Sequence, residues 1–81
     1  MYYIYVLKSQ NTKSLYKGQT DNLKKRLREH NNGKVKSTKA FIPWEIIYYE
    51  EFLSREEAVN REKYLKSGIG RQFLKEKIER G

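Results

Sequence analysis

Cysteine is absent from this chain of 81 residues, and histidine occurs once, at His30. Without cysteine there can be no disulfide bond, no thiolate metal site and no cysteine nucleophile, and one histidine cannot build a multi-histidine metal cage. Asp21 is the only aspartate, so a site in which several aspartates hold two metal ions is also hard to assemble. Any catalysis must therefore use tyrosine, glutamate, arginine, lysine and one histidine.

Long apolar runs are missing as well. No segment reaches the roughly 20 residues that a membrane-spanning helix needs, and no charged start is followed by an apolar stretch and a small-residue cleavage site. We therefore expect a cytoplasmic protein that does not bind membranes. A chain this short holds one hydrophobic core, so residues 1–81 are expected to form one domain.

Negative charge is scarce relative to positive charge. Eighteen Lys and Arg residues against ten Asp and Glu give a formal net charge of +8, which creates a field that attracts polyanions. The content of 37% hydrophobic and 14% aromatic residues is typical of a folded domain rather than a disordered tail. So large a charge on so few residues favours nucleic acid or an anionic surface over a small neutral substrate.

The hydrophobic pattern predicts three strands. Residues 2–7 and 15–20 are rich in β-forming residues and are separated by a turn-prone segment, which indicates a β-hairpin. A third strand is expected over residues 44–52, directly after Pro43, and it is apolar on both faces. A strand of this kind needs cover on both sides.

A helix is expected after a cap within residues 20–22, and it extends to residue 32. Its inward stripe contains two leucines, but also Arg26 and His30, which lie one turn apart on the same face. Two polar side chains therefore interrupt the stripe that must face the core.

A capping box, Ser54 with Glu57, opens a second helix that extends to about residue 66. On this helix Glu62 falls between two inward-facing apolar residues at helical spacing. Two glycines are expected to break the helix, and a third helix is expected over residues 71–80.

The element order is therefore β-β-α-β-α-α, without internal repeats or a linker between domains. This order predicts the α+β class, with a small three-stranded antiparallel sheet flanked by helices.

Inward-pointing charges must find each other, a metal or a cleft, because burying an unpaired charge costs several kcal/mol or shifts its pKa. Each candidate has a purely structural alternative. Arg26 can extend to solvent, His30 can be a satisfied core or capping histidine, and Glu62 can pair with Arg61 or Lys66 on the surface. Three such residues on two helices of a basic chain nevertheless favour a shared site for an anionic substrate.

The ordered motifs of the chain resemble those of the GIY-YIG nucleases, in particular short members similar to the nuclease module of the bacterial excision-repair incision subunit. The matching elements are Tyr3-Ile4-Tyr5, Tyr16-Lys17-Gly18, Arg26 and His30 in an Arg-Leu-x-x-His pattern, and Glu62. Tyr3 stands in place of the first signature glycine, Lys17 in place of the middle isoleucine, and Gln19 where the excision-repair branch tends to carry a lysine. The resemblance spans nearly the whole chain and implies a GIY-YIG endonuclease-like fold.

The resemblance also implies roles for individual residues. Glu62 would bind one divalent cation, Mg²⁺ or Mn²⁺, with water and the scissile phosphate completing the coordination. Arg26 would stabilise the charge that develops at phosphorus, and Tyr5 or Tyr16 would orient or deprotonate the attacking water. His30 would hydrogen-bond the tyrosine or pass its proton onward, and Lys17 is a plausible helper.

The implied activity is hydrolysis of phosphodiester bonds in DNA, with RNA not excluded, in a setting such as repair or recombination of structured DNA. Backbone phosphates would contact basic side chains, for which the candidates are Lys17, Lys24, Lys25, Arg28, Lys34, Lys36, Lys39, Lys66 and Arg71. We expect a monomer or weak dimer whose specificity comes from a protein partner.

Two other functions fit the same composition. A nucleic-acid-binding module of the same fold would keep the basic surface without needing the Tyr, Arg and Glu cluster. An interaction protein would use its basic face to dock an acidic protein.

Overall fold

The computed structural model describes residues 1–80, so Gly81, the last residue of the expected domain, lies outside the described residues. The elements are β1 (Tyr2–Ser9), β2 (Leu15–Thr20), α1 (Leu23–Asn31), a short 3₁₀ helix η1 (Lys39–Phe41), β3 (Trp44–Phe52), α2 (Arg55–Leu65) and α3 (Gly68–Arg80). The predicted order β-β-α-β-α-α is confirmed. Among the described helices, none is both long and apolar enough to cross a membrane.

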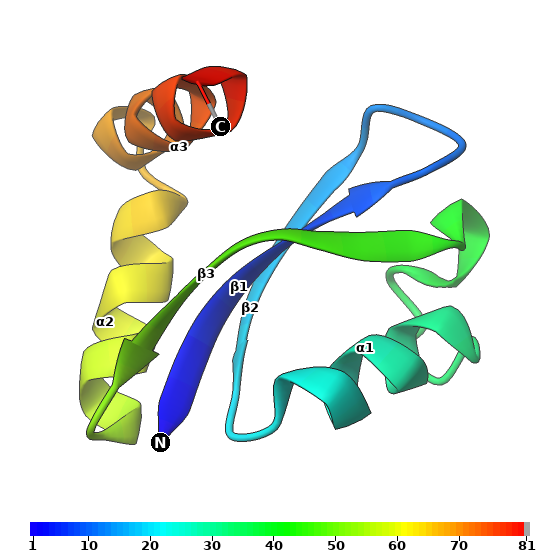
Figure 1. The fold of residues 1–81 in the computed structure, drawn as a ribbon, viewed down its shortest axis with the longest axis horizontal. Helices are drawn as coiled ribbons and strands as arrows, with labels where there is room; N and C mark the ends of the chain where they lie inside the picture. Colours follow the sequence, from blue (N-terminus) through cyan, green and yellow to red (C-terminus); the bar gives the residue numbers. More distant parts are fainter. Residues whose placement is uncertain (81) are drawn as a thin grey trace.

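The three strands form one antiparallel sheet in the order β2-β1-β3, which places the N-terminal strand in the centre. Helix α1 covers one face, and α2 and α3 lie on the opposite side (Figure 1). Because side chains alternate along a strand, β1 contributes to two cores. Ile4 and Val6 pack in the cluster with α2 and α3, whereas Tyr5 and Leu7 pack in the cluster with α1.

A bulge in β3 explains why this strand is apolar on both faces. Val6 pairs with Tyr48 but Leu7 pairs with Ile46, so Ile47 is an extra residue without a partner on β1. A bulge breaks the alternation of side chains along the strand. Ile46 therefore packs in the α1 cluster, while Ile47 and Tyr48, consecutive in sequence, both pack in the α2 and α3 cluster.

Helix α1 is capped at its start and tied to the sheet at its end. The Asn22 side chain accepts a hydrogen bond from the Lys25 backbone N–H at 3.1 Å, which satisfies one of the free donors of the first turn. At the other end, the Asn31 amide accepts from the backbone N–H of Trp44 at 2.6 Å and donates to its carbonyl at 3.0 Å. This pair of bonds ties the end of α1 to the start of β3.

Helix α2 begins at the predicted cap, because Ser54 accepts from the Glu57 backbone N–H at 3.2 Å. On its β3 side, Arg61 donates two hydrogen bonds to the Glu50 carboxylate, at 2.8 and 3.1 Å, and Tyr48 donates a third. Burial disfavours ionised Glu50, but the bonds from Arg61 and Tyr48 outweigh it and hold the pKa of Glu50 below its usual value. This ion pair joins α2 to the sheet.

The predicted start of α3 at residue 71 was wrong, since the helix begins at Gly68. The Ser67 hydroxyl oxygen accepts from the Gly70 backbone N–H at 3.2 Å and so caps the helix. Gly70 does not break the helix. A Cβ at this position would overlap the Tyr64 carbonyl oxygen and lie 2.6 Å from the Leu65 Cα, so glycine is needed where α3 folds back against the end of α2.

Gly70→Ala and Gly68→Ala should change stability in opposite directions. The added methyl group at residue 70 meets fixed backbone, so the free energy of unfolding should fall by about 1–3 kcal/mol. At residue 68 nothing lies within 4 Å of the new Cβ, and alanine should stabilise the helix by up to about 1 kcal/mol. Urea denaturation of both variants measures this, and equal effects at the two positions would contradict the described packing.

Candidate active site

Tyr5 is buried at the centre of the sheet, with 2% of its surface exposed. Its Cα partner on β2 is Gly18, and its ring lies over that glycine. A Cβ at Gly18 would come within 2.6 Å of the Tyr5 hydroxyl oxygen and 2.8 Å of its Cζ. The absence of a side chain at residue 18 therefore provides the space that the Tyr5 ring occupies.

The Tyr5 hydroxyl contacts the two polar residues of the α1 stripe. It lies 3.0 Å from His30 Nε2, and its oxygen accepts a hydrogen bond from Arg26 Nε at 3.4 Å. Arg26 also forms an ion pair with Glu29 at 3.2 Å. The helical spacing that places Arg26 and His30 on one face thus brings both onto the same tyrosine.

Tyr16 lies beside this cluster on β2. Its ring centroid is 4.9 Å from that of His30 and 6.3 Å from that of Tyr5. Within residues 1–80 its hydroxyl makes no side-chain hydrogen bond, so the hydroxyl is available to water or to a bound molecule.

Glu62 approaches the cluster from α2 without joining its hydrogen bonds. Its carboxylate forms an ion pair with Lys66 Nζ at 2.7 Å, and 22% of its side chain is exposed. This is one of the two surface partners that the sequence offers. The negative charge of Glu62 is still close enough to Tyr5 to contribute to raising the pKa of that phenol.

Burial is the main influence on ionisation within the cluster. It raises the pKa of Tyr5, although the hydrogen bond and the positive charge of Arg26 oppose this effect. Burial, assisted by the charge of Arg26, lowers the pKa of His30 from 6.5 to about 4. At neutral pH the free protein therefore holds a neutral tyrosine against a neutral histidine.

Thr38 is a member of this cluster that sequence reasoning missed. Its hydroxyl oxygen lies 2.8 Å from His30 Nδ1, and its side chain is 1% exposed. Thr38 lies in the basic connector between α1 and β3, which has no hydrophobic periodicity. Nothing in its local sequence marks it, because the contact depends on how the connector folds back over α1.

The candidate metal ligand is a single carboxylate. Within residues 1–80, no three His, Asp or Glu side chains gather into a metal cage. Mg²⁺ needs no such cage, because it commonly keeps several waters and uses one or two carboxylates together with phosphate oxygens of the substrate. Glu62, half-buried beside the cluster, fits this mode by the chemistry of its oxygen donors.

The predicted phosphate-binding residues do not form one surface. Lys17 of β2 lies near Lys66 and Arg71, whose positive charges, after burial, help to lower its pKa. The connector that carries Lys34, Lys36 and Lys39 lies on the other side of the molecule, beyond the end of α1 (Figure 1). The basic residues of α1 also diverge, because Lys24 and Lys25 line different hollows and Arg28 is exposed.

A small polar hollow of about 220 Å³ adjoins the Tyr5 cluster. Its lining residues are Gln19, Thr20, Asp21, Lys25, Arg26, Glu29 and Arg55. Arg55, which the sequence did not single out, also lies over the Tyr2 ring at 5.3 Å. Three cations and two carboxylates thus line this hollow, which shares Arg26 with the Tyr5 cluster.

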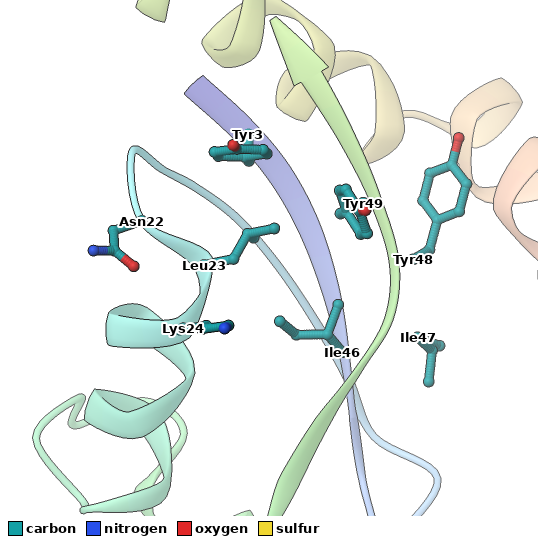
Figure 2. A pocket seen from close by; sticks show the side chains of 8 residues that line it. All are labelled: Tyr3, Asn22, Leu23, Lys24, Ile46, Ile47, Tyr48 and Tyr49. Atoms are coloured by element: carbon teal, nitrogen blue, oxygen red, sulfur yellow. The ribbon is translucent and has the colours of Figure 1, made fainter. Parts of the chain in front are cut away.

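A wider groove of about 750 Å³ lies on the other flank of α1, next to β3. Figure 2 shows Tyr3, Leu23, Ile46 and Tyr49 converging on it, while Ile47 and Tyr48 point away. None of the five predicted catalytic residues lines this groove. Its size therefore does not identify it as the reaction site.

The sequence matches the family model of the GIY-YIG catalytic domain over residues 1–74. The chain belongs to the GIY-YIG family. This family is of the nuclease type, and the two tyrosine motifs of the GIY-YIG domain are the strand segments that bring Tyr5 and Tyr16 beside His30.

Small bacterial proteins of the UPF0213 group are relatives of this GIY-YIG domain. A UPF0213 protein of Clostridium perfringens is 45% identical over 75 residues, covering 91% of this chain and 80% of the relative. One of Staphylococcus haemolyticus is 40% identical over 75 residues, covering 91% and 90%. The solution NMR structure of a UPF0213 protein from Bacillus halodurans has 31% identity and a TM-score of 0.53, covering 91% of this chain and 82% of that one.

The buried histidine of this GIY-YIG domain should make stability depend on pH. Because the pKa of His30 is about 4 in the folded protein and 6.5 ordinarily, the unfolded chain binds more protons between these values. The contribution of His30 to stability should therefore be complete above pH 6.5 and decline as pH falls to 4, by about 3 kcal/mol in total.

Denaturant unfolding of the wild type and of His30→Gln across this pH range isolates the effect from the glutamates that titrate nearby. The difference between the two stability curves should shrink steadily on acidification. A constant difference from pH 7 to pH 4 would show that His30 does not have the lowered pKa.

Proposed function

We propose that this protein is a metal-dependent endonuclease that hydrolyses phosphodiester bonds of DNA. The observation that carries the proposal is the contact of the Tyr5 hydroxyl with both His30 and Arg26, at 3.0 and 3.4 Å, beside the charge of Glu62. A phosphodiester reaction needs a proton acceptor, a cation for the developing charge and a carboxylate for a metal ion. Tyr5, His30 and Arg26 are in contact, and Glu62 lies near enough for its charge to act on Tyr5, in a chain of a nuclease-type family.

Arg26 supplies the fixed positive charge. Within the described residues it uses Nε for Tyr5 and Nη1 for Glu29, so most of its five N–H donors remain free. It also lines the small hollow with Lys25 and Arg55. A phosphate in this hollow would be held by a guanidinium that Tyr5 and Glu29 already orient, which lowers the cost of ordering it at the moment of reaction.

Tyr5 and His30 supply a path for a proton. As water attacks phosphorus, the Tyr5 oxygen takes a proton from the water while its own hydroxyl proton moves to His30 Nε2. This transfer is unfavourable in the free protein, because the pKa of His30 is about 4 and that of Tyr5 is raised. The negative charge of a bound phosphate favours the imidazolium form and so assists the step. Tyr16, whose ring packs beside those of Tyr5 and His30, would orient the water.

Glu62 is the residue that would hold the divalent cation, Mg²⁺ or Mn²⁺. When bound, such an ion neutralises charge on the phosphate and stabilises the leaving oxygen. In the free protein Lys66 occupies the Glu62 carboxylate at 2.7 Å. Lys66 lies in the group with Lys17 and Arg71, so a phosphate of the bound strand gives its ammonium group an alternative partner.

The net charge supports the same proposal, because +8 on 81 residues suits sequence-independent contact with a phosphate backbone. A cytoplasmic location, a monomeric or weakly dimeric state and a partner that supplies specificity remain predictions. One observation favours the non-catalytic binding module as the second candidate. The Glu62 carboxylate is bound to Lys66 instead of facing an open coordination site.

Glu62→Gln distinguishes the two functions. The purified protein should nick supercoiled or branched DNA with Mn²⁺ or Mg²⁺ and not with a chelator. The variant, which keeps the size of the side chain but removes its charge, should lose at least about 100-fold of that activity.

Glu56→Gln is the matched control, because it removes the same charge from an exposed position in the first turn of α2 and should cut like the wild type. Salt-dependent DNA binding without any product would support the binding module. Equal cleavage by all three proteins would overturn the role of Glu62.

A further inference from the structure

Thr38 is fixed in place by contacts other than its hydroxyl. Its backbone N–H donates to the Val35 carbonyl at 3.2 Å, and its carbonyl accepts from the Phe41 N–H at 3.1 Å and from the Trp44 indole Nε1 at 2.9 Å. The same Trp44 is tied to the end of α1 through Asn31. The position of residue 38 beneath His30 therefore does not depend on the side chain that it carries.

The side chains of Tyr5, His30 and Thr38 form one buried hydrogen-bonded chain. From the sheet to the connector, its distances are 3.0 Å from the Tyr5 hydroxyl to His30 Nε2 and 2.8 Å from His30 Nδ1 to the Thr38 hydroxyl. The chain ends 3.3 Å further, where the Thr38 hydroxyl donates to the Val35 carbonyl. His30 is 0% exposed, so neither ring nitrogen can substitute water for its protein partner.

The direction of this chain follows from its two ends. Arg26 Nε can only donate, so the Tyr5 oxygen accepts from it and the Tyr5 hydrogen is left to donate to His30 Nε2. At the other end, the Thr38 hydroxyl lies 3.3 Å from the Val35 carbonyl, which can only accept. When the Thr38 hydrogen is given to that carbonyl, the Thr38 oxygen accepts from His30 Nδ1–H. Every hydrogen in the chain then has an acceptor.

The opposite direction leaves a hydrogen without a partner. With the proton on Nε2, the Tyr5 oxygen would accept from both His30 and Arg26, and the hydrogen of a hydroxyl buried over Gly18 would have no acceptor among the described residues. An unsatisfied buried donor is costly. The Nδ1–H tautomer is therefore the one that the surroundings stabilise.

We propose that Thr38 is a positioning residue that holds His30 in the Nδ1–H tautomer, which leaves Nε2 free to receive the proton of Tyr5. The consequence for catalysis rests on the proposed nuclease function, but the tautomer itself does not. A histidine with its proton on Nε2 would instead donate to Tyr5 and could not take the proton that Tyr5 must release when it deprotonates water. Thr38 thus acts on the reaction without touching the substrate.

Nitrogen NMR of the free protein tests the tautomer directly. Long-range ¹H–¹⁵N spectra of ¹⁵N-labelled protein at pH 7 distinguish protonated from unprotonated ring nitrogens, and His30 is the only histidine. The wild type and Thr38→Ser, which keeps the hydroxyl, should both show the proton on Nδ1. Thr38→Val, which has the same shape without the hydroxyl, should shift the population toward Nε2–H.

Either of two spectra would overturn the proposal, namely Nε2–H in the wild type or an unchanged Nδ1–H tautomer in Thr38→Val. The wild-type spectrum needs no variant, so the test stands even where Thr38→Val folds poorly. In cleavage assays Thr38→Val should lose about 10- to 100-fold activity, as much as the loss of the outer hydrogen-bond partner of a metal-ligating histidine costs, and Thr38→Ser should retain activity. If the wild type itself does not cut DNA, the nuclease proposal fails while the spectra still decide the role of Thr38.

Discussion

The Tyr5 ring packed over Gly18 is the contact on which the rest of the site depends. Two central positions of a hairpin face each other, and one of them lacks a side chain so that the other can lie across it. The hydroxyl then reaches α1 on the same face of the sheet, where Arg26 and His30 project one turn apart. Displacing the ring would break both hydrogen bonds together, so the hairpin and α1 are positioned by one another.

The two faces of the sheet carry different polar networks. On the α2 and α3 face, Glu50 is satisfied by Arg61 and Tyr48, and this network links α2 to the sheet. On the α1 face, Arg26 uses Nε for Tyr5 and Nη1 for Glu29 within residues 1–80. The Tyr5 hydroxyl there begins a buried chain of hydrogen bonds through His30 to Thr38. A closed network contributes to stability, whereas an open one beside a hollow can bind an anion and move a proton.

The sequence predicted the features of this arrangement that depend on residues close together in the chain. The first cap was expected within residues 20–22 and the second at Ser54, because these residue types favour helix starts, and they lie at Asn22 and Ser54. The shared face of Arg26 and His30 follows from helical spacing. The site roles of these residues, by contrast, remain predictions. The start of α3 was mistaken because Gly70 reads as a helix breaker, whereas the structure uses it for close approach to α2.

Features that depend on distant segments could not be predicted. The bulge at Ile47 depends on the pairing of β3 with β1. It lets a run of four apolar residues pack on both faces of the sheet. The ion pair of Glu62 with Lys66 was one of several alternatives that the sequence left open. The contact of Thr38 with His30 depends on the fold of the connector, which no periodicity describes.

The cleavage activity of Tyr5→Phe tests the proposed role of the buried hydroxyl most directly. This change keeps the ring over Gly18 and removes only the hydroxyl that joins His30 to Arg26. Metal-dependent cleavage should fall at least about 100-fold, while DNA binding and cooperative unfolding should be retained. Cleavage at the wild-type rate would show that the Tyr5 hydroxyl does not take part in the reaction and would contradict the central claim.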